Sequence, residues 1–147
     1  MATKAVLRIA AIAAVATLFG CDKTPKDPAN FAREFGSTLT SGKSAEDYYC
    51  YKPDYPSFSQ QYQTKSGEAV SVVGVQSGPP PNSDYPQSVS QISLQIGDDQ
   101  VPLVIWPTDD FKTFLAEQYK FLNLEMPSAS AFSEFDNCAM LVPSAAP

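Results

Sequence analysis

Residues able to carry out acid–base, nucleophilic or metal chemistry are few in this chain. It has no histidine among its 147 residues, which removes the commonest general base, the Ser-His and Cys-His nucleophile arrangements and most zinc sites. Two acidic pairs, Asp98-Asp99 and Asp109-Asp110, are the strongest remaining candidates. The first suits a hairpin turn, the second suits a helix start, and neither has the ligand spacing of a calcium loop. We therefore predict no catalytic residue, no metal site and no cofactor.

One short motif, Gly42-Lys43-Ser44, has the residues that close a phosphate-binding loop. That motif needs a glycine five positions before Gly42, but Ser37 stands there, and no strand pattern precedes the segment. A turn that ends one helix, followed by a cap for a new one at Ser44, fits the residues better.

The first twenty residues differ in composition from the rest of the chain. Lys4 and Arg8 are followed by an uncharged run from Ile9 to Phe19. The run has the length of a signal-peptide apolar region and is shorter than the ~20 residues needed to span a bilayer. A buried core helix is the alternative, but the position at the extreme N-terminus, with two cations at its start, favours an export signal.

The end of this run, Leu18-Phe19-Gly20-Cys21, resembles the lipobox of bacterial lipoproteins, in which an apolar residue and a small residue precede a cysteine. The resemblance implies that residues 1–20 are a signal peptide and that Cys21 carries a diacylglyceryl group with acyl chains such as palmitate. The mature protein would then be anchored in the bacterial cell envelope, facing the periplasm. Asp22 is similar to a signal that retains enteric lipoproteins in the inner membrane, but it equally suits the start of a polar tether over residues 21–28. Inner and outer membrane both stay open.

Export would place the other two cysteines in a compartment where disulfides form. With Cys21 committed to lipid, Cys50 and Cys138 remain, and an oxidising envelope compartment favours joining them. The alternative is a pair of buried free thiols. We predict a disulfide between Cys50 and Cys138.

Two regions carry residues typical of recognition surfaces. Residues 48–62 are rich in tyrosine, whose rigid apolar ring and polar tip suit protein or glycan contact, although about half of these rings could instead pack in the core around Cys50. Residues 77–87 are rich in proline and form either a contact loop or a stiff spacer. The candidate partner-binding residues are Tyr51, Tyr55 and Tyr85.

Hydrophobic periodicity predicts the elements that hold these residues. Asp27-Pro28 has the cap and first-turn proline of a helix that ends at Ser41-Gly42. Thr108 is expected to cap a second helix with an apolar side that reaches Leu122. Between them, alternation predicts a hairpin of strands 91–96 and 101–105.

Three further segments complete the predicted fold. Alternation slips by one residue at Gly74, which indicates a β-bulge, and residues 59–65 are expected to add a polar edge strand. Residues 131–142 fit either a helix or a strand. We predict one α+β domain over residues 29–142, with an antiparallel sheet of three or more strands and helices packed on one face, followed by a flexible tail, 143–147.

The net negative charge of the chain limits the classes of partner that it can bind. The chain has 16 acidic and 10 basic residues, and Lys4 and Arg8 would leave with the signal peptide, so we expect no nucleic-acid partner. The leading hypothesis is a lipid-anchored envelope binding or accessory protein without catalytic activity, which binds another envelope protein. The alternative is a periplasmic inhibitor or immunity protein against a basic wall-degrading enzyme, since opposite charge would speed that association.

Overall fold

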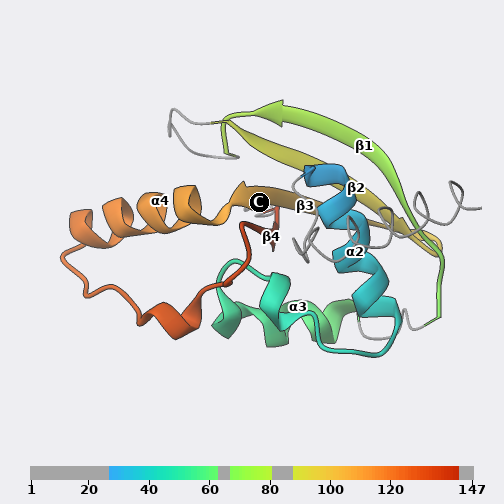
Figure 1. The fold of residues 1–147 in the computed structure, drawn as a ribbon, viewed down its shortest axis with the longest axis horizontal. Helices are drawn as coiled ribbons and strands as arrows, with labels where there is room; N and C mark the ends of the chain where they lie inside the picture. The colour runs from blue at the N-terminus through green and yellow to red at the C-terminus, as the bar shows by residue number, and fades with distance from the viewer. Residues whose placement is uncertain (1–26, 63–66, 81–87, 143–147) are drawn as a thin grey trace, which may run out of the picture.

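A computed structural model describes residues 27–62, 67–80 and 88–142 of the chain. The described part is an α+β fold with one four-stranded antiparallel sheet in the order β1-β2-β3-β4, which confirms the predicted fold class (Figure 1). In chain order the elements are α2 (Pro28–Thr40), η1 (Glu46–Tyr48), η2 (Lys52–Asp54), α3 (Tyr55–Tyr62), β1 (Val70–Gly78), β2 (Val89–Ile96), β3 (Asp99–Pro107), α4 (Thr108–Phe121), η4 (Ala129–Ala131) and β4 (Asn137–Leu141). Within the described ranges, no helix is both long and apolar enough to cross a bilayer.

The ends of α2 are as predicted from the sequence. The Asp27 carboxylate accepts a hydrogen bond of 3.0 Å from the Asn30 amide, and Pro28 occupies the first helical position, where its missing N–H costs nothing. Gly42 follows the helix with a φ of +81°, a backbone conformation that glycine adopts without strain. The Gly42-Lys43-Ser44 motif is therefore a helix-ending turn.

The start of α4 differs from the prediction. Pro107, the last residue of β3, is the capping residue, and Thr108 is the first residue of the helix. The Thr108 amide donates to the Asp136 carbonyl at 2.8 Å. The buried Thr108 hydroxyl has no partner among the described residues. At its other end, α4 stops at Phe121 with Leu122 as its cap, and Asn123 follows with a left-handed φ of 55°.

The predicted hairpin and bulge are both confirmed. β2 and β3 pair in antiparallel register around a turn at Gly97, whose φ is +58°. In β1, Val72 pairs with Leu94 and Gly74 with Ser93. Val73 is therefore the extra residue that the alternation slip at Gly74 indicated.

The expected edge strand over 59–65 is wrong, because residues 55–62 form α3 and residues 63–66 lie outside the described part. Tyr55, Phe58 and Tyr62 recur at helical spacing and are all buried, so burial of the aromatic rings outweighs the polar residues between them. The ambiguous segment near the C-terminus is resolved as a strand, since Asn137–Leu141 pairs with β3.

Alternate residues along the strands point to opposite faces of the sheet and pack into two separate core clusters. On one face lies the larger cluster, with α2 in contact with all four strands and α3 contributing its aromatic rings. Gly36 lets α2 approach the sheet closely, because a Cβ there would lie 2.7 Å from Cγ1 of Val70. A second cluster joins Trp106, Phe111 and Phe132 near the start of α4. Figure 1 shows α4 continuing from β3 and extending away from the sheet, so its C-terminal end lies at the periphery.

Candidate functional site

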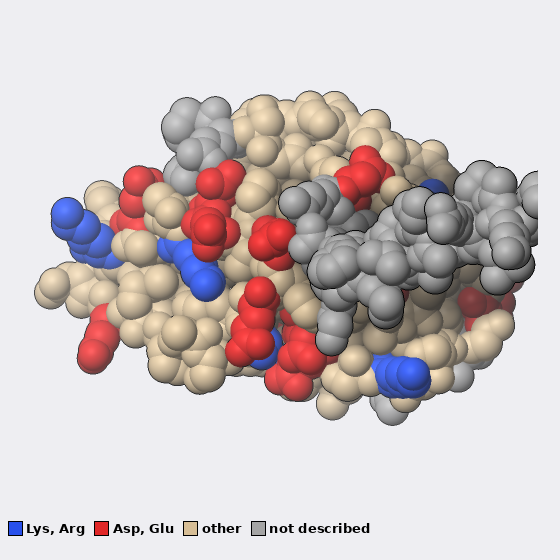
Figure 2. All heavy atoms as spheres, in the orientation of Figure 1, with Lys and Arg blue, Asp and Glu red and all other residues tan. Residues whose placement is uncertain are grey.

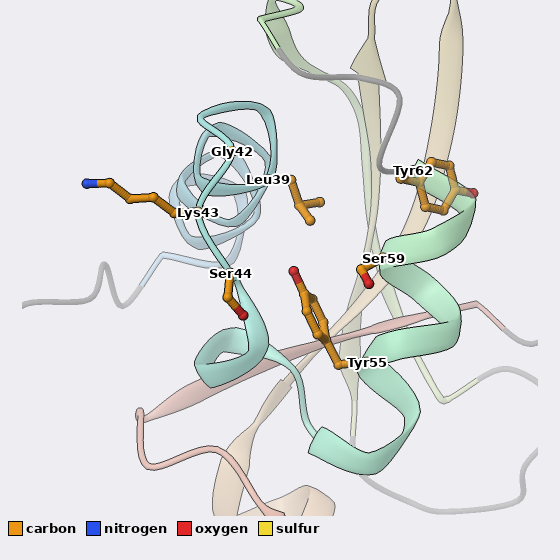
Figure 3. Close-up of a pocket in the computed structure, with 7 residues that line it drawn as sticks. All are labelled: Leu39, Gly42, Lys43, Ser44, Tyr55, Ser59 and Tyr62. Atoms are coloured by element: carbon orange, nitrogen blue, oxygen red, sulfur yellow. The ribbon is translucent and has the colours of Figure 1, made fainter.

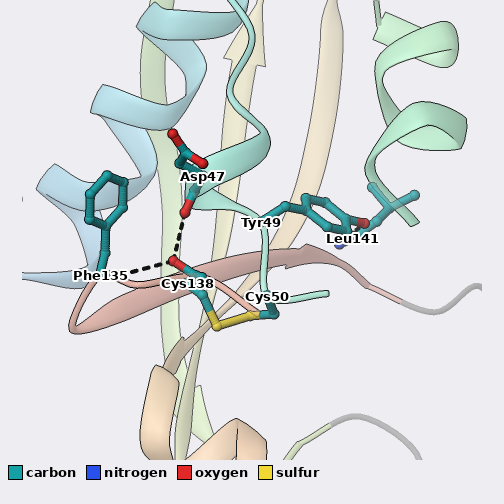
Figure 4. Close-up of a disulfide and its surroundings, with 7 residues drawn as sticks. Asp47, Tyr49, Cys50, Phe135, Cys138 and Leu141 are labelled. Atoms are coloured by element: carbon teal, nitrogen blue, oxygen red, sulfur yellow. Dashed lines mark hydrogen bonds between the residues drawn. A yellow bond between two sulfur atoms is a disulfide. The ribbon is translucent and has the colours of Figure 1, made fainter. Parts of the chain in front are cut away.

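The segment 47–51 is fixed onto β4, the last strand of the sheet. The Cys50 amide donates to the Ala139 carbonyl at 2.9 Å, and the predicted disulfide joins Cys50 to Cys138. The Leu141 amide donates to the Tyr49 hydroxyl at 3.3 Å. The Ser133 hydroxyl donates to the Asp47 carbonyl at 2.6 Å. Figure 4 shows Asp47 and Tyr49 on the segment that the disulfide joins to β4. We call this set of contacts the clasp; it holds the aromatic stretch in a fixed position beside α4.

Most rings of the aromatic stretch are in the core. Tyr49, Tyr55, Phe58 and Tyr62 are all buried, with at most 9% of each residue exposed. The Tyr55 hydroxyl accepts a hydrogen bond of 2.9 Å from the Ala45 amide, so this candidate contact residue has a structural partner. Four of the six rings are thus in the core, more than the half expected, and they belong to the larger cluster, whereas Cys50 belongs to the second.

Tyr51 lies at an accessible apolar cavity beside α4. An apolar groove of about 260 Å³ separates the 49–54 segment from α4. Burial, the neighbouring Tyr119 and the charge of Asp54 together raise the pKa of Tyr51 above its ordinary value. The groove is lined by Tyr49, Cys50, Tyr51, Asp54, Phe111, Phe114, Leu115, Tyr119 and Met140. It can accept an apolar side chain, with Asp54 available to a basic neighbour of that side chain.

An exposed apolar tip continues from the same helix. Phe121 and Leu122 end α4, and the chain returns past Asn123 through Leu124 and Met126. The exposed fractions are 87%, 59%, 57% and 37% for Phe121, Leu122, Leu124 and Met126 respectively. The tip has a defined backbone, because the Leu124 amide donates to the Tyr119 carbonyl at 2.8 Å. Contiguous exposed apolar residues of this kind are typical of protein or membrane contact surfaces.

An acidic hollow of about 300 Å³ lies at the other end of α4. The carboxylates of Asp109, Glu134 and Asp136 line it, together with the single cation Lys112 among its lining residues. Figure 2 shows acidic side chains gathered around the start of α4 on the visible face. The hollow can accept a cationic side chain from another protein more readily than an anionic one.

A more open hollow of about 470 Å³ lies between the end of α2 and α3. Its walls include Ser44, Ser59 and the Tyr55 hydroxyl, while Lys43 extends away from it (Figure 3). A phosphate-binding loop would need that lysine to point inward. Among the described residues there is also no group of three or more acidic, cysteine or histidine side chains placed to hold a metal ion.

Two predicted site residues, Cys21 and Tyr85, lie outside the described residues. Sequence reasoning missed the apolar tip, although its signal was present. Phe121 and Leu122 continue the apolar side of α4, and that periodicity was assigned to the core as far as Leu122. The pattern indicates an apolar helix face but not where the covering elements stop.

Comparison with known proteins adds no relative, since no protein-family model, curated protein or solved structure matches the chain.

Proposed function

We propose that this chain is a lipid-anchored binding or accessory protein of the bacterial cell envelope, without catalytic activity of its own. Cys21 supplies the lipid anchor, and the partner is another envelope protein. The partner contacts the apolar groove beside α4 and the apolar tip at the C-terminal end of that helix.

The strongest support for this proposal is the exposure of the apolar tip. A Phe121 side chain that is 87% exposed gains about 1.5–3 kcal/mol when a partner buries it. Leu122 and Leu124, each more than half exposed, add to that gain. The groove beside them contributes aromatic walls and the Tyr51 hydroxyl, a combination enriched where proteins meet.

The test compares partner capture by variants of the full processed chain, isolated in detergent from the cells in which it occurs. Replacing Phe121 and Leu122 together with serine should weaken capture of its main partner by roughly tenfold to a hundredfold, because the lost burial is worth 1.4 kcal/mol per factor of ten. Val73→Ser is the matched control, since Val73 is also an exposed apolar residue, 52% exposed, on the far edge of the sheet. Equal capture by the double variant and the control would reject the α4 surface as the contact site.

Tyr51→Ala tests the groove in the same assay. Tyr55→Ala is unsuitable for this purpose, because Tyr55 is buried and holds the Ala45 amide. A Tyr51 variant that captures the partner as well as the unsubstituted chain would limit the contact surface to the tip.

The acidic hollow favours a second candidate function, an inhibitor or immunity protein that blocks a basic wall-degrading enzyme. A lysine or arginine of that enzyme would enter between Asp109, Glu134 and Asp136. Association would then slow steeply as salt rises, whereas binding through the apolar tip would change little. Measuring the association rate at low and moderate salt separates the two functions.

A further inference from the structure

The two edge strands of the sheet, β1 and β4, differ in whether another segment covers their outer edge. The β4 edge is covered by the clasp, through a bridge between Tyr49 and Ala139 and the disulfide of Cys50 with Cys138. Within the described residues, β1 has a strand neighbour, β2, on one side only. The backbone N–H and C=O groups along its outer edge are therefore the ones available for a further strand.

The sequence of β1 lacks the features that usually block such pairing. Protected edge strands carry lysine, proline or inward-pointing charge, but Val70–Gly78 contains no charged residue and no proline. The bulge at Val73 bends the first part of the strand. After it, Gly74–Gly78 pairs with β2 in unbroken register, and Val75 in this stretch is 59% exposed. This regular stretch is an open, uncharged edge with an apolar side chain on it.

A second copy of the chain is the occupant that β1 itself favours, because that copy offers an identical, uncharged edge strand. Two copies carry the same excess of acidic residues, 16 against 10 basic, so most parts of their surfaces repel each other. That repulsion is least where β1 meets β1, since both strands are uncharged. An antiparallel pair of identical strands satisfies a two-fold axis, the symmetry of most homodimers.

We propose that two copies of this chain pair antiparallel through the outer edge of β1, over Gly74–Gly78, and join their sheets into one. The pairing buries Val75 of each copy and leaves the apolar groove and tip on α4 free. It is thus independent of the function proposed above.

The test places a photo-reactive amino acid at Val75 of the full chain in cells. Irradiation should give an adduct of twice the mass of the chain, containing peptides of this chain alone. Gln76→Lys should lower the yield of that adduct at least about tenfold, because it sets like charges against each other across the pair. Thr113→Lys, which adds the same charge at an exposed position of α4, should leave the yield unchanged.

Three cross-linking results would overturn the proposal. These are the absence of any adduct at Val75, an adduct with a different protein alone, and a dimer adduct that Gln76→Lys leaves intact. Sedimentation of the unsubstituted chain in detergent micelles is a second readout that requires no substitution, and a monomer at all concentrations would also refute it. Retention of the disulfide between Cys50 and Cys138 shows that each variant is folded.

Discussion

Removing the disulfide tests both the stability of the fold and the rigidity of the groove. Cys50 and Cys138 are 88 positions apart and fully buried. Closing a loop of that length lowers the conformational entropy of the unfolded chain, which stabilises the fold by roughly 4–5 kcal/mol. For a domain of this size, such a loss lowers the melting temperature by about 10–20 °C. We expect a shift of that size for the double variant Cys50→Ala, Cys138→Ala.

The assay is thermal unfolding followed by circular dichroism in non-reducing buffer. Reducing the unsubstituted protein is the matched control, because it breaks the cross-link without removing the sulfur atoms from the core. Both should melt at similar, lowered temperatures. Amide hydrogen exchange adds a local readout: the Leu141 amide, which donates to the Tyr49 hydroxyl, should exchange faster once the clasp is loosened. A double variant that melts within about 2 °C of the oxidised protein would refute the reasoning.

Three further predictions address packing, titration and anchoring. Gly36→Ala should cost about 1–3 kcal/mol in urea denaturation, because its Cβ would lie 2.7 Å from Val70 Cγ1, whereas Gly78→Ala, with no atom within 4 Å, should not. Burial raises the pKa of Tyr49 above its ordinary value, despite the opposing hydrogen bond from the Leu141 amide. Its neutral form therefore stabilises the fold fully below pH about 10, and that stability is lost as pH rises further; Tyr49→Phe should flatten the urea midpoint against pH in this range. Cys21→Ser should abolish incorporation of labelled palmitate and release the protein from membranes, and continued labelling would contradict the lipid anchor.

Features that depend on neighbouring residues were predictable from the sequence. The Asp27 cap, the turn at Gly97 and the bulge beside Gly74 each follow from a few adjacent residues whose backbone preferences are strong. Thr108 was misplaced by one position because Pro107 supplies the extended backbone that a cap requires.

Features that depend on distant partners were not predictable in this way. α3 forms because Phe58 packs against Phe35, with 5.4 Å between ring centroids, and nothing in residues 59–65 shows that α2 lies opposite. Tyr51 and Tyr55 have the same residue type and similar flanks, yet Tyr55 is buried and borders the hollow beside α3, while Tyr51 lines the apolar groove. The apolar tip has the same periodicity as a core helix, and it is exposed because the covering elements end before Phe121.

If the chain is exported from its N-terminus, as proposed, the clasp imposes an order on folding. β1 to β4 follow one another along the chain and pair with their sequence neighbours, so the sheet can assemble as each strand emerges. The segment around Cys50 emerges earlier, but its partners, Cys138 and Ala139, come last. Until then the Cys50 thiol has Cys21 as the one other cysteine that has emerged. Prompt lipidation of Cys21 would block that mispairing, so the anchor would also act as a protecting group for the disulfide.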